Sequence, residues 1–168
     1  NPLLVDYFFL VWVRCPGAAG PTWSDGRSEN KCFDGVQGVY THTSEVCKCD
    51  MTFGLFLPTE ANEGPVPVLW SLSGLTCTHE NAMTKAGAQQ WASENNLALV
   101  FPDTSPRGDL VPNHDDFDLG QGAGFYLDAK NSPWNKNFNM ESYIKDELSA
   151  LHHRQELLHL RYSFQNND

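Results

Sequence analysis

Two almost uninterrupted apolar runs constrain the fold of this chain more than any other feature of its sequence. Val66–Leu72 reads VPVLWSL, and Leu97–Phe101 reads LALVF. Runs of this kind are typical of strands buried on both faces, as in a parallel sheet covered by helices. Between them, Asn81–Asn95 predicts a helix whose packing side consists of alanines and Trp91. Strand, helix and strand form a βαβ unit, so the sequence predicts the α/β class.

The segments on either side of this unit extend the same pattern. Val36–Thr43 and Asp50–Leu57 are rich in β-forming residues and predict two more strands. A long stretch rich in Gly, Pro, Asp and Asn covers residues 103–137, and loops of that length in a compact domain are usually functional or disordered. Met140–Leu160 then predicts a helix with Ile144 and Leu148 on one face.

Charge and cysteine content exclude several classes of function. Lys and Arg total 11 against 21 Asp and Glu, and the net charge of −10 disfavours binding to nucleic acid. No apolar run approaches the roughly 18 residues of a membrane span, so we expect no membrane partner. The five cysteines are few and odd in number, which argues against a disulfide framework and favours reduced thiols and a cytoplasmic location. A zinc site built from Cys47-x-Cys49 and Cys77-x-His79 is a weak alternative because the spacing is unusual, so we predict no metal and no cofactor.

The chemistry is expected where the two buried strands end, since ligands of open α/β sheets bind at the carboxyl ends of the strands. Two loops leave the sheet there, Ser73–Thr78 (SGLTCT) and Asp103–Gly108 (DTSPRG). These loops, together with KAGAQ at 85–89, GAGFY at 122–126 and Pro133-Trp134, resemble the S-formylglutathione hydrolases, also called the esterase D family. The resemblance covers about Ser28–Leu151.

The resemblance implies an incomplete α/β-hydrolase fold: the N-terminal strands and first helices of a mixed, mainly parallel sheet. By this reading, 1–27 is an unrelated or disordered N-terminal segment, 28–151 is the N-terminal part of the hydrolase domain, and 152–168 is a divergent tail. The implied sheet order leaves Val66–Leu72 with an unpaired apolar edge, a liability for aggregation. We therefore expect a marginal monomer that forms homo-oligomers or associates through this strand edge.

The family's activity is serine thioesterase hydrolysis of S-formylglutathione to formate and glutathione, in formaldehyde detoxification, with carboxylesterase side activity. Its catalytic Ser lies on a G-x-S-x-G elbow, and no such motif occurs in these residues. We therefore assign none of the Ser/Asp/His triad to this chain and expect the chain alone to be inactive. The alternative is a non-catalytic interaction protein that uses the half-fold to bind a partner.

What remains by resemblance is one side of the oxyanion hole, namely the backbone amide of Leu75 supported by Gly74. The residues implied to lie beside the pocket are Cys77, Phe125, Tyr126 and Trp134. Each has a plainer interpretation: Cys77 as a small buried hydrophobe, and the three aromatics as packing of the long loop.

Several charged and histidine side chains also have two interpretations. Arg107 either pairs with Asp103 or another loop carboxylate, or recognises a glutathione carboxylate, and we favour the ion pair. The cluster of Asp115, Asp116 and Asp118 lacks the spacing of an EF-hand and predicts a solvated loop. None of the histidines has evident reason to serve as a general base; those considered are His79, His114, His152, His153 and His159.

Overall fold

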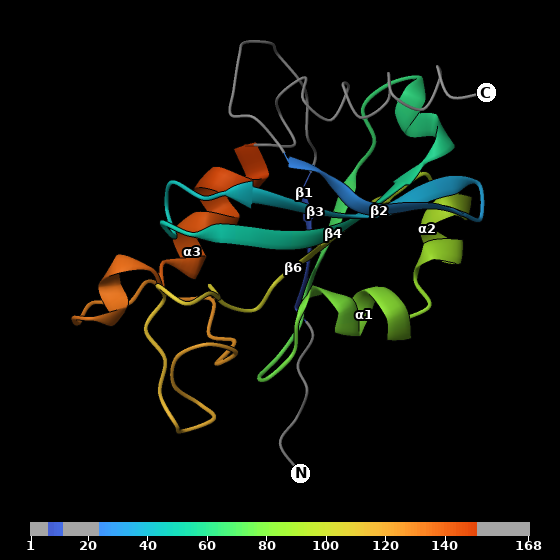
Figure 1. Cartoon of the computed structure of the whole chain (residues 1–168). Coiled ribbons are helices and arrows are strands. Elements are labelled where there is room, and N and C mark those ends of the chain that lie inside the picture. Colours follow the sequence, from blue (N-terminus) through green and yellow to red (C-terminus); the bar gives the residue numbers. More distant parts are fainter. Residues whose placement is uncertain (1–6, 12–23, 151–168) are drawn as a thin grey trace.

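The computed structural model describes residues 7–11 and 24–150, with side chains from residue 29 onward. These residues form one six-stranded sheet in the order β1-β5-β6-β4-β3-β2, with helices packed against it (Figure 1). The strands are β1 (Tyr7–Val11), β2 (Ser24–Cys32), β3 (Gly35–Thr43), β4 (Asp50–Pro58), β5 (Val68–Leu72) and β6 (Ala98–Pro102). The predicted α/β class is confirmed, and the predicted strands are present with ends shifted by one or two residues.

The sheet is mixed, as predicted, but its described part is not mainly parallel. β5 and β6 run parallel, whereas each of the other neighbouring pairs among the described strands is antiparallel. For β2–β3 and β3–β4 the reason is connectivity, because these strands follow one another through short turns, which can join only antiparallel neighbours. The parallel pair needs a crossover, and the helices between Leu72 and Ala98 supply it.

The edge of β5 is paired, contrary to our expectation for Val66–Leu72. β1 runs antiparallel along it, with Tyr7 opposite Leu72 and Val11 opposite Val68. An open strand edge presents a row of N–H and C=O groups, and a tethered extended segment can satisfy them. β1 and β2 are consecutive in sequence yet lie at opposite edges of the sheet.

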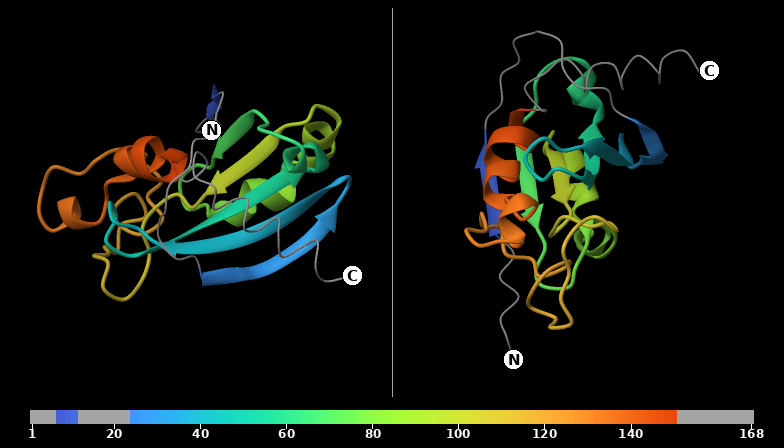
Figure 2. Two further views of the ribbon diagram at one scale, coloured as in Figure 1. Left: turned by 90° about the horizontal axis from the view of Figure 1, so that it is seen from above. Right: turned by 60° about the vertical axis from the view of Figure 1, so that its left-hand side comes forward.

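Helices cover both faces of the sheet (Figure 2, right). α1 (His79–Lys85) and α2 (Gln89–Glu94) lie on one face, and α3 (Met140–Ser142) with a π-helical turn (Tyr143–Leu148) lies on the other. Alternate side chains of β4 and β6 divide between the two layers. The α1/α2 layer contains Phe56, Met83, Ala92, Leu99 and Phe101, and the opposite layer contains Phe53, Leu55, Val100, Met140, Tyr143 and Leu148.

The helix predicted over 81–95 is in fact two helices. Thr78 caps α1 through a capping box with Asn81. Gly87 adopts φ +63° between α1 and α2, a conformation that ends a helix and favours glycine. Trp91, which we placed on the packing side, lies on α2 and is 68% exposed.

The last helical segment docks on the turn between β3 and β4. The Glu147 carboxylate accepts hydrogen bonds from Ser44 Oγ at 2.5 Å and from the Glu45 and Val46 N–H groups at 2.7 and 3.3 Å. Beneath it, the buried Tyr143 hydroxyl lies 3.0 Å from His42 Nε2. The predicted helix over Met140–Leu160 is therefore present to the end of the described chain, and its part beyond residue 150 lies outside the described residues.

Candidate active-site loops

The loops that follow β5 and β6 meet at the carboxyl ends of these strands, as the sequence predicts. The backbone carbonyl of Cys77 accepts two hydrogen bonds from the second loop, from Thr104 Oγ1 at 2.5 Å and from Arg107 Nη2 at 3.0 Å. Parallel neighbours end at the same side of the sheet, which is why loops about 27 residues apart in the chain come into contact. The two loops therefore form one unit.

Asp103 organises that unit. Its carboxylate lies 3.0 and 3.2 Å from Arg107 Nε and accepts the Thr104 N–H at 2.7 Å. His79 Nδ1 is 3.9 Å from the same carboxylate. Burial raises the pKa of Asp103, but His79, Arg107 and the Thr104 N–H outweigh it and hold that pKa below its usual value. The predicted Asp103–Arg107 ion pair is confirmed.

A third segment, residues 122–126, holds the loop after β5 from the other side. The Gly122 carbonyl accepts the Thr76 N–H at 2.8 Å, and the Tyr126 hydroxyl donates to the Ser73 carbonyl at 2.9 Å. In the sequence, this segment stands out only through its family resemblance and its aromatic residues. Its two glycines, Gly122 and Gly124, both at positive φ in the structure, are the signal of a close backbone approach.

The Leu75 N–H lies in the middle of this arrangement. The N–H groups of the next two residues are used, Thr76 by Gly122 and Cys77 by the Gly74 carbonyl at 3.2 Å. Within the described chain the Leu75 N–H has no hydrogen-bond acceptor. A free N–H held by neighbours that are themselves fixed is the type of group that binds a developing oxyanion.

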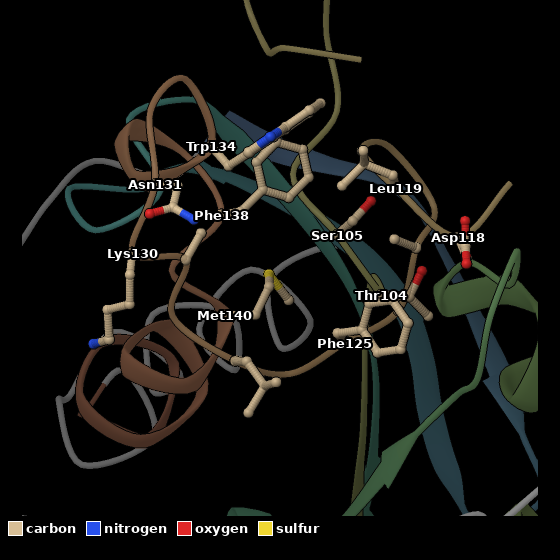
Figure 3. A pocket seen from close by; sticks show the side chains of 15 residues that line it. Thr104, Ser105, Asp118, Leu119, Phe125, Lys130, Asn131, Trp134, Phe138 and Met140 are labelled. Atoms are coloured by element: carbon tan, nitrogen blue, oxygen red, sulfur yellow. The ribbon is translucent and has the colours of Figure 1, made fainter. Parts of the chain in front are cut away.

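A mainly apolar cavity of about 270 Å³ lies beside these loops (Figure 3). Phe125 and Trp134 line it, whereas Cys77 and Tyr126 are not among its lining residues. Gly124 belongs to both features, because it lines the cavity and packs against the Gly74–Leu75 peptide. The remaining walls include Leu119, Leu127, Phe138, Met140 and the charged residues Asp118 and Lys130.

The other candidate residues are dispersed. The His114 ring lies at the surface, with Nδ1 3.3 Å from Asp116 Oδ2. Burial raises the pKa of Cys47 to about 12, so its thiol is a poor source of thiolate. In the part of the chain that the structure describes, no three His, Cys, Asp or Glu side chains gather into a group that could hold a metal. His152, His153 and His159 lie outside the described residues.

Among the helices within residues 7–11 and 24–150, none is both long and apolar enough to cross a membrane.

A mixed sheet whose parallel strands end in contacting loops is consistent with part of an α/β-hydrolase fold. A solved structure of an S-formylglutathione hydrolase from Agrobacterium tumefaciens matches it with a TM-score of 0.74 and 49% sequence identity, over 76% of this chain and 47% of that chain. That likeness confirms the predicted partial α/β-hydrolase fold.

Sequence comparison then gives the family. The family model described as "Putative esterase" matches residues 44–155. An S-formylglutathione hydrolase from Paracoccus denitrificans (strain Pd 1222) is 60% identical over 124 residues, which are 74% of this chain and 44% of that protein. The chain therefore belongs to this esterase family. It spans less than half the length of both relatives.

Proposed function

We propose that this chain contributes one half of the oxyanion hole of a serine thioesterase that hydrolyses S-formylglutathione to formate and glutathione, with carboxylesterase side activity. The observation that carries the proposal is the unbonded Leu75 N–H, held at the end of β5 beside an apolar cavity. The proposed substrate is the one that the two related proteins, both S-formylglutathione hydrolases, are named for. Gly74 precedes the donor in a tight turn closed by the Cys77 N–H.

The proposed chemistry assigns an electrostatic role to this chain. When a nucleophile attacks a thioester carbonyl, negative charge develops on its oxygen, and a preorganised N–H stabilises it. Losing one such donor typically costs a factor of about 10²–10³ in rate. The sequence has no G-x-S-x-G motif, so we expect no acyl-enzyme to form on the chain alone.

The cavity supplies the proposed substrate side of the site. Phe125 and Trp134 would form its walls, with Cys77 and Tyr126 adjacent on the loops that hold Leu75. Arg107 is an unsuitable receptor for a glutathione carboxylate because its guanidinium already binds Asp103 and the Cys77 carbonyl. The described cysteines are free thiols, which supports the proposed cytoplasmic location.

Turnover measurements on two proteins test the proposal. The chain alone is expected to leave S-formylglutathione and a p-nitrophenyl ester unhydrolysed. The chain extended by the part of the Paracoccus relative that follows the matched region is expected to hydrolyse both. In the extended protein, Leu75→Pro removes the N–H and should lower kcat by about 10²–10³, whereas Leu75→Ala keeps the N–H and serves as control. Turnover by the unextended chain would refute its expected inactivity. A Leu75→Pro variant as active as Leu75→Ala would refute the role of the Leu75 N–H in the oxyanion hole.

A further inference from the structure

We infer that residues 122–126 form a clamp whose role is to present the Leu75 N–H, and that Gly124 is its positioning residue. This inference rests on the proposed function of Leu75, because the clamp matters for catalysis only if that N–H binds the oxyanion. The clamp reaches from a long loop, more than 45 residues further along the chain than Leu75. Its contacts hold the Gly74–Leu75 peptide on three sides.

The closest contact is backbone against backbone. A Cβ placed on Gly124 would lie 3.1 Å from the carbonyl carbon and oxygen of Gly74 and 3.1 Å from the Leu75 nitrogen. Gly124 also has φ +71°, where other residues are strained. Any side chain here would therefore press directly on the peptide that carries the donor.

Two hydrogen bonds fix the same peptide from its flanks. Tyr126 Oη binds the Ser73 carbonyl, one residue before it, and the Gly122 carbonyl binds the Thr76 N–H, one residue after it. The Thr76 N–H is therefore used by the clamp, and the Leu75 N–H beside it is left without an acceptor. The clamp thus fixes the position of the donor.

The clamp is itself anchored to the loop after β6. The Gly122 N–H donates to Ser105 Oγ at 2.6 Å, and Ser105 is buried. Three loops from separate parts of the chain therefore form one rigid support. Such support is needed because a displacement of about 1 Å at a reacting group can cost a factor of about 10² in rate.

Amide NMR on the ¹⁵N-labelled chain tests the clamp without any turnover. In the wild type, the Thr76 amide should be protected from hydrogen exchange and the Leu75 amide should exchange freely. Gly124→Ala should shift the Leu75 and Thr76 resonances and speed exchange at Thr76 at least about tenfold, a loss of one hydrogen bond. Gly87→Ala is the matched control, because Gly87 has φ +63° but a Cβ there meets nothing within 4 Å.

A Gly124→Ala spectrum that differs from wild type no more than Gly87→Ala does at residues 74–77 would overturn the inference. Should Gly124→Ala fail to fold, Tyr126→Phe gives the same decision: a shifted Ser73–Leu75 region supports the clamp, and an unchanged one refutes it. If the NMR results support the clamp but the extended protein does not hydrolyse S-formylglutathione, only the proposed function is refuted. If the extended protein is active but the NMR results show no effect of Gly124→Ala on residues 74–77, only the clamp is refuted.

Discussion

Replacing Asp103 by Asn tests whether an ion pair holds the two site loops together. The Asp103 side chain is 9% exposed, and it receives Arg107 Nε and the Thr104 N–H. An Asn side chain keeps one oxygen for Thr104 but removes the negative charge opposite Arg107. The change therefore isolates the charge while preserving size and much of the local hydrogen bonding.

The expected cost follows from the burial of the two partners. A hydrogen bond to a charged group contributes about 1.5–3 kcal/mol. Because the Arg107 side chain is 36% exposed, solvent screens the pair, and we expect a loss of about 1–2 kcal/mol in the free energy of unfolding at pH 7.

The loss should also depend on pH in a defined direction. The pKa of Asp103 is lower in the folded chain than in the unfolded chain, so its stabilisation is complete above the unfolded value of about 4 and disappears as the pH falls through the folded value. The difference between wild type and Asp103→Asn should therefore be constant near neutrality and narrow below about pH 4.

Urea denaturation from pH 7 down to the lowest pH at which both proteins fold gives the measurement. Asp116→Asn is the control, because Asp116 faces His114 at the surface with its side chain 70% exposed, and its cost should stay below about 0.5 kcal/mol. Equal costs for the two variants, or an Asp103→Asn difference that does not change with pH, would refute the reasoning.

Two further predictions concern the edges of the fold. Glu147→Ala removes the acceptor of three hydrogen bonds from the β3–β4 turn and should lower the free energy of unfolding in urea by about 2 kcal/mol. The control Glu141→Ala breaks only a surface pair with Lys145 and should change that free energy little. Equal losses in the two variants would contradict the docking role of Glu147. Deleting residues 1–11 removes β1 and exposes the β5 edge, so sedimentation velocity should show dimers or larger species; a monodisperse monomer as stable as the full chain would show that β1 protects nothing.

The sequence predicts those parts of the fold whose signals are local. The apolar runs that become β5 and β6 can be recognised in the sequence without knowledge of the neighbouring strands, because a strand buried on both faces consists almost entirely of apolar residues. The same runs predict where the site loops begin, and Asp103 and Arg107 lie four residues apart in one loop, within reach of each other. The ion pair was therefore predictable as well.

The parts that were mispredicted depend on contacts between distant segments. No local pattern in residues 7–11 shows which edge of the sheet they pair with, and β1 closes an edge that we expected to be open. The helix break at Gly87 is a single backbone conformation, and Trp91 in the helix after it is exposed to solvent. The alanine-rich pattern continues on both sides of this glycine, so a prediction from periodicity alone gives one helix where the structure has α1 and α2.

The position of the candidate donor also depends on contacts between distant segments, even though the donor residue itself was predicted. Resemblance pointed to Leu75, but a backbone N–H is a useful donor only if it is unbonded and its peptide is fixed. The second condition is met by Gly122–Tyr126, whose glycines allow the approach and whose carbonyl and hydroxyl hold Thr76 and Ser73. The chemistry of this site therefore depends as much on the shape of a distant loop, where a methyl group at Gly124 would displace the donor, as on the residues that would face the substrate.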